Sequence, residues 1–213
     1  LGTFLASFLS QITGRNFILS SIFCTFIALV GVVTSFCIEE TPPSGSKKKL
    51  EVFFWKEIWW SLNQARQHTA LLPAMLGSAY FLFVGAFAQL NIIPFAVQSL
   101  GLSDIEGGYL FFLTASGIGT GPWIAGKISG KGVELGLVPL GAAGMALIAF
   151  LLNFFADTLP AVVVLVALLG VFGGIFEIPL DSYIQITSPK EERGQMVAAT
   201  NFMSFIGVLL ASF

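Results

Sequence analysis

The sequence predicts an all-α membrane protein, and three observations lead to this prediction. Hydrophobic residues make up 55% of the chain and charged residues only 10%, whereas soluble domains carry about 25% charged residues. The mean hydropathy is +0.87. Apolar runs of about 20 residues recur along the chain, which is the length a helix needs to cross a bilayer. The chain is therefore expected to be multi-pass, with membrane lipid as a partner and no nucleic acid.

The apolar runs define the predicted helices in order. Glycine and proline recur inside them, which membrane helices tolerate better than soluble ones. Partial runs stand at both ends, so we expect the chain to be an internal piece of a longer protein. The full-length runs are Phe17–Ile38, Leu71–Val97, Gly107–Lys127, Leu135–Ala156 and Ala161–Gln185, and the partial runs are Leu1–Gln11 and Gln195–Phe213.

The basic residues predict the orientation of these helices. Nine of the ten lie in alternate connections, and Arg15 alone lies on the other side. The positive-inside rule makes the basic side cytoplasmic. The nine residues are Lys47, Lys48, Lys49, Lys56, Arg66, Lys127, Lys131, Lys190 and Arg193.

The connection at 39–70 is longer than the others and divides the chain into parts. Residues 1–38 are predicted to end one helical half, and residues 71–213 to form most of a second. Within the connection, Trp55, Trp59 and Leu62 recur at helical spacing. This segment is either an amphipathic helix at the membrane interface or a linker helix docked on the protein.

Two carboxylates in the last full-length run are the main candidates for a functional site. Glu177 and Asp181 are four residues apart, so they share one face if the helix is continuous. Pro179 lies between them and removes a backbone donor, which favours a bend. Acids within a membrane span are costly and usually functional. The alternative is that they pair with a neighbouring helix or reach the interface.

Other polar residues in the spans are weaker candidates. Gln89 and Asn91 precede Pro94, where a bend would turn them towards a cavity, although interhelical hydrogen bonds explain them as well. The segment 116–122 has the glycine content of a nucleotide-binding loop but lies inside an apolar span. Its glycines, like Gly170 and Gly174, have the small-xxx-small spacing of close helix packing.

The sequence gives no sign of a metal site or a cofactor. Cys24 and Cys37 lie in or at the end of one apolar run, without the spacing of metal ligands. His68 is the only histidine. The cysteines are therefore interpreted as packing residues.

Two short basic loops resemble the cytoplasmic loop motif of the major facilitator superfamily. One is Lys127-Ile-Ser-Gly-Lys-Gly-Val-Glu134, which contains Lys131, and the other is the loop at 188–194, which contains Arg193. In that superfamily such loops clamp neighbouring helices by charge pairing and help to gate the inner mouth. The alternative is ordinary positive-inside charge.

Longer stretches resemble one family of this superfamily, the lysophospholipid transporters. They are residues 125–141, the segment Phe176-Glu-Ile-Pro-Leu-Asp-Ser-Tyr-Ile-Gln185, and Ala198-Ala-Thr-Asn-Phe202. Asp181 stands where that family commonly has Asn. The resemblance implies that the chain covers about helices 5 to 11 of twelve, in a bacterial inner membrane. It also implies a possible fused or associated acyltransferase outside this chain.

Three functions are open on this evidence. The first is movement of lysophospholipid by alternating access, with Glu177 meeting a cationic headgroup group or forming a gate pair. The second is transport of another small solute or drug, coupled to protons through Glu177. The third, an intramembrane enzyme, has little support because both acids lie on one predicted helix, so we expect no enzymatic activity in this chain.

Overall fold

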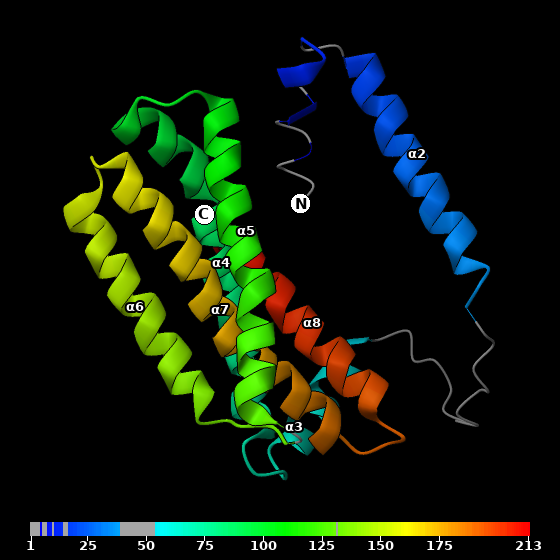
Figure 1. Ribbon diagram of the computed structural model, residues 1–213. Coiled ribbons are helices and arrows are strands. Elements are labelled where there is room, and N and C mark those ends of the chain that lie inside the picture. Colours follow the sequence, from blue (N-terminus) through cyan, green and yellow to red (C-terminus); the bar gives the residue numbers. More distant parts are fainter. Residues whose placement is uncertain (1–4, 6–7, 10, 15–16, 39–53, 131) are drawn as a thin grey trace.

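The computed structural model describes residues 5, 8–9, 11–14, 17–38, 54–130 and 132–213 of the 213-residue chain. Secondary structure within these residues consists of α-helices alone (Figure 1), which confirms the predicted fold class. Each full-length apolar run coincides with one helix. The helices are α2 (Phe17–Ser35), α3 (Phe54–Ala65), α4 (Leu71–Leu100), α5 (Asp104–Ser129), α6 (Leu137–Phe155), α7 (Leu159–Thr187) and α8 (Arg193–Leu210).

The helices differ in how apolar they are. By length and composition, α2, α4, α6 and α7 could each cross a membrane. Helix α5 falls short in hydropathy because glycine, serine and threonine interrupt its apolar residues. In α8 the lower hydropathy comes mainly from Arg193, Gln195 and Asn201. With 26 residues, α5 is still about 39 Å long at 1.5 Å per residue, more than the ~30 Å hydrocarbon core.

Helices α3 to α8 pack into one bundle, and α2 stands apart from it (Figure 1). No described side chain of α2 is buried. The described segment before α2 contacts the bundle through a hydrogen bond in which the Tyr109 hydroxyl of α5 donates to the Gln11 side-chain carbonyl. The bundle is thus the part of the structure in which a site can be built.

Glycines bring α5 and α7 into backbone contact. A Cβ added to Gly117 would lie 2.2 Å from the carbonyl oxygen of Ala167, and one added to Gly170 would lie 2.1 Å from that of Thr114. Residues 121 and 174 form a second close pair one turn along, where an added Cβ would lie 2.4 and 2.6 Å from its nearest atom. The small-xxx-small prediction is confirmed, and the segment 116–122 lies inside α5 rather than in a loop. Contact this close lets van der Waals packing hold membrane helices together.

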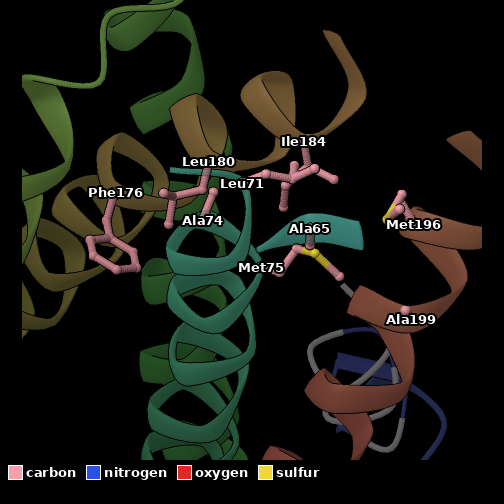
Figure 2. Close-up of a cluster of buried hydrophobic side chains, with 9 residues drawn as sticks. All are labelled: Ala65, Leu71, Ala74, Met75, Phe176, Leu180, Ile184, Met196 and Ala199. Carbon is pink, nitrogen blue, oxygen red and sulfur yellow. The ribbon is translucent and has the colours of Figure 1, made fainter. Parts of the chain in front are cut away.

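A cluster of buried apolar side chains joins α3, α4, α7 and α8 near one end of the bundle (Figure 2). Its members come from all four helices, so the cluster fixes the C-terminal part of α7 against the start of α4. They are Ala65, Leu71, Ala74, Met75, Phe176, Leu180, Ile184, Met196 and Ala199.

The ends of the bundle agree with the predicted orientation. The α5–α6 and α7–α8 connections, both basic, lie at the same end as α3, and the α4–α5 and α6–α7 connections lie at the other (Figure 1). At that other end, α5 begins with a capping box. The Ser103 hydroxyl accepts from the Glu106 amide, and the Ser103 amide donates to the Glu106 carboxylate at 2.8 Å. The backbone and side-chain hydrogen bonds from Ser103 lower the pKa of Glu106.

The tryptophan-rich segment forms α3, which packs on α8 and the start of α4. Ser61 and Ala65 are buried in this contact. The Trp55 ring meets the Phe202 ring of α8 edge-on, with centroids 5.2 Å apart. Trp59 is 69% exposed. The segment is therefore a docked helix that also presents tryptophan outward, while the lysines at 47–49 lie outside the described residues.

Candidate functional site

The centre of the candidate site is a hydrogen bond between α4 and α7. The Ser78 hydroxyl donates to Oε1 of Glu177 at 2.5 Å, and Ser78 is buried. The other carboxylate oxygen of Glu177 is also buried, and no described residue hydrogen-bonds to it. A buried polar atom without a partner is costly in a protein interior. Among the buried side-chain oxygens and nitrogens of the described residues, this Glu177 oxygen is the one without a hydrogen-bond partner, which makes it a candidate contact for a bound group.

Asp181 lies one turn further along the same helix. Helix α7 is continuous through Pro179, so the expectation that the two acids share a face is confirmed. The stretch between them is held tightly, because a Cβ added to Gly77 of α4 would lie 2.9 Å from the Leu180 side chain. The carboxylates are thus positioned by packing rather than by flexible side chains alone.

The charge of this pair defines its chemistry. Neither carboxylate forms an ion pair within the described part of the chain. Burying a carboxylate without a partner costs several kcal/mol, and two acids one turn apart repel each other. The arrangement therefore favours a cationic group or a proton at the free oxygen of Glu177.

A cavity of about 280 Å³ lies further along the same contact between α4 and α7. Gln89 is among its lining residues, whereas Asn91 does not line it. The Asn91 amide is exposed and donates to the carbonyl of Phe87 in the preceding turn of α4, at 2.8 Å. The structure thus separates the two predicted polar residues and leaves only Gln89, itself an exposed side chain, at the edge of this cavity.

Phe81 lies between the carboxylate site and this cavity. It lines the cavity, its ring centroid is 6.1 Å from that of Phe176, and a Cβ added to Gly173 would lie 3.1 Å from it. Glu177 and Ser78 are not among the cavity's lining residues. The aromatic ring therefore partitions a polar site from an apolar space along one contact between helices.

Comparison with known proteins identifies the family. A sequence profile described as Major Facilitator Superfamily matches residues 1–212. The chain belongs to this superfamily. No curated protein and no solved structure matches the chain. The superfamily comprises membrane transporters, so the family of this chain indicates a multi-pass transporter rather than an enzyme.

In this facilitator the residues of the basic loops make local contacts. The Lys127 ammonium lies 3.7 Å from the centroid of the Trp123 ring, a cation–π contact. Oε1 of Glu134 accepts from the Gly136 amide at 3.3 Å. Arg193 is exposed at the first residue of α8, and Lys131 lies outside the described residues. The structure therefore does not bring these loop residues together with the carboxylate pair.

Sequence reasoning missed three side chains near the site. Ser78 is one of many small hydroxyl residues in the spans, and its register against Glu177 depends on the tertiary packing. Phe81 is one of 22 phenylalanines, none of which the sequence distinguishes. The Tyr183 hydroxyl donates to the backbone carbonyl of Thr69 in the turn before α4. Its position two residues after Asp181 was the only available signal.

The described residues also bear on metal binding. Among them, no three His, Cys, Asp or Glu side chains are grouped as metal ligands would be. Cys24 and Cys37 are free and exposed on or just after α2. The site therefore consists of two carboxylates and a hydroxyl, which could bind a cation through charge and hydrogen bonding.

Proposed function

We propose that this facilitator moves lysophospholipid across a bacterial inner membrane to the cytoplasmic leaflet, by alternating access. The single observation that carries the proposal is the buried free oxygen of Glu177 beside its hydrogen bond to Ser78. A protonated amine such as that of ethanolamine would satisfy this oxygen and neutralise the charge of the acid pair. Charge-assisted hydrogen bonds of this kind are among the strongest in proteins.

The depth of Glu177 supports a transport role. Ten residues separate it from Thr187, the last residue of α7, which corresponds to about 15 Å along the helix axis. This is about half of a ~30 Å hydrocarbon core. Transporters of this general type bind their substrate near the midplane, where alternating access exposes it to each side in turn.

The test is transbilayer movement of headgroup-labelled lysophosphatidylethanolamine by the full-length protein in spheroplasts. Glu177→Gln keeps the size of the side chain and removes its charge. We expect Glu177→Gln to slow lipid movement by about 10- to 100-fold, which corresponds to the free energy of one hydrogen bond to a charged group. Asp157→Asn, the same chemical change in the exposed α6–α7 connection, is the matched control and should move lipid at the wild-type rate.

Two results would contradict the proposal. One is a correctly inserted full-length protein that moves no lysophospholipid. The other is a Glu177→Gln variant that moves it as fast as the Asp157→Asn control. Ser78→Ala gives a graded check, because it removes one hydrogen bond and keeps the charge. It should slow movement less than Glu177→Gln does.

The same free oxygen also favours a second candidate, a facilitator for another small solute or drug that is coupled to protons. A proton on this oxygen would remove the charge that an amine would otherwise neutralise. Uptake would then respond to collapse of the pH gradient in the wild type, and this response would vanish in Glu177→Gln. A lysophospholipid carrier that recognises the amine alone would show no such response.

A further inference from the structure

We propose that the cavity beyond Phe81 receives the acyl chain of the transported lipid, a role that rests on the proposed function. The acid pair and the cavity lie in one line. On α4, residues 78, 81, 85 and 89 recur at spacings of three or four, and so do residues 170, 173 and 177 on α7. Such spacings place residues on one face of a helix. An amphiphile aligned with these helices would meet a carboxylate at one end and the cavity at the other.

The distance between the two parts suits a single amphiphile. Seven residues of α4 separate Ser78 from Gly85, which is about 10 Å along the helix. A cationic headgroup at Glu177 would therefore leave the start of its chain near Phe81. The ring of Phe81 separates the two environments, and the chain would pass beside it.

The cavity has the chemistry of an acyl-chain site. Its described lining comes from five helices and is apolar except for Gln89 and Thr114. The Thr114 hydroxyl already donates to the Leu110 carbonyl of its own helix, so it does not require a polar ligand. The volume of about 280 Å³ is just below the roughly 300–1,000 Å³ of small-ligand pockets. This size favours one slim chain over a diacyl lipid.

Gly85 makes the inference testable without disturbing the fold. It lines the cavity, and a Cβ added to it meets nothing within 4 Å. Gly85→Leu therefore places an isobutyl group in the space that the chain would use. Gly119→Leu is the matched control, because its added Cβ also meets nothing within 4 Å, but it lies on an exposed face of α5 away from the cavity.

The first measurement is chain-length selectivity in the full-length protein. Movement of octadecanoyl and decanoyl lysophosphatidylethanolamine is compared for wild type, Gly85→Leu and Gly119→Leu. Each methylene group that stays in water instead of entering an apolar site lowers the binding constant by a factor of about four. We therefore expect Gly85→Leu to lower the ratio of long-chain to short-chain movement by at least about tenfold, and Gly119→Leu to leave it unchanged.

The second measurement does not depend on transport. Octadecanoyl lysophosphatidylethanolamine with a photoactivatable group at the end of its chain is cross-linked to the protein, and labelled residues are mapped by mass spectrometry. We expect the label to fall within residues 81–92 of α4 in the wild type. Gly85→Leu should lose this label, and Gly119→Leu should keep it. An excess of unlabelled lysophospholipid should prevent the labelling by competition.

The outcomes separate the two proposals. Suppose that the wild type is labelled, that Gly85→Leu loses the label, and that the wild type moves no lysophospholipid. This result would support the cavity as an acyl-chain site and overturn lysophospholipid transport. Transport with an unchanged chain-length ratio and no label near the cavity would overturn the cavity assignment alone, because the chain would then stay among the bilayer tails. Neither transport nor label would overturn both.

Discussion

Replacing Gly170 with alanine tests whether backbone contact between α5 and α7 holds the bundle together. The added Cβ would lie 2.1 Å from the carbonyl oxygen of Thr114, whereas ordinary contact begins at 3.4 Å. The oxygen belongs to a helix backbone and has no side-chain rotation by which to move away. The two helices must therefore separate by roughly 1 Å, a gap that forfeits a quarter to a half of the dispersion energy across the contact.

The expected loss of stability follows from this displacement. Overpacking a well-packed interior costs about 1–3 kcal/mol. For a protein of this size, each kcal/mol lowers the melting temperature by about 2–4 °C. We expect the full-length Gly170→Ala protein in detergent to lose its monodisperse form several degrees below the wild type, as measured by size-exclusion chromatography after heating.

Gly119→Ala is the internal control for this experiment. It makes the same change in α5, but nothing lies within 4 Å of the added Cβ. Alanine is a better helix former than glycine by about 1 kcal/mol, so this variant should melt at or above the wild-type temperature. Equal melting temperatures for Gly170→Ala and Gly119→Ala would refute the argument that the glycines set the helix spacing.

Three further predictions concern the ends of the helices. Ala70 has φ +63°, which costs a non-glycine residue about 1–2 kcal/mol. Ala70→Gly should therefore raise the melting temperature, whereas Ala143→Gly in the middle of α6 should lower it. The lowered pKa of Glu106 means that its capping contribution is present above the unfolded value of about 4.3 and is lost as the pH falls through the folded value. The protection of the amides at the start of α5, measured relative to their intrinsic exchange rates, should therefore fall in acid, and Glu106→Gln should remove this dependence. Tyr183→Phe removes one hydrogen bond to the turn before α4, so exchange in that turn should rise by about 2- to 10-fold.

The fold could be predicted closely from the sequence because the bilayer restricts what an apolar run of twenty residues can do. The run at 71–97 became α4 at Leu71–Leu100, and the run at 161–185 became α7 at Leu159–Thr187. The glycine spacing in α5 and α7 was informative for the same reason, since helices in lipid associate through close packing. The composition of the segment at 54–65 indicated an amphipathic helix, but not that it docks on α8.

The candidate site could be predicted only in part. Glu177 stood out because charge is rare in a membrane span, and its four-residue spacing from Asp181 placed both acids on one face. Its partner could not be predicted, because the register of Ser78 depends on how α4 slides and rotates against α7. Asn91 was predicted to turn towards a cavity together with Gln89 because of a bend at Pro94, but two residues along a helix turn a side chain by about 200°. The structure accordingly places it on another face.

The hydrogen bond from Tyr183 to Thr69 attaches the acid-bearing helix to the turn between α3 and α4. Tyr183 lies only two residues beyond Asp181. A displacement of this part of α7 must either break the bond or carry the α3–α4 turn with it. Because α3 is also packed on α8, the displacement would be transmitted to α8 as well. A displacement of the carboxylates is therefore coupled mechanically to the α3–α4 turn and, through α3, to α8.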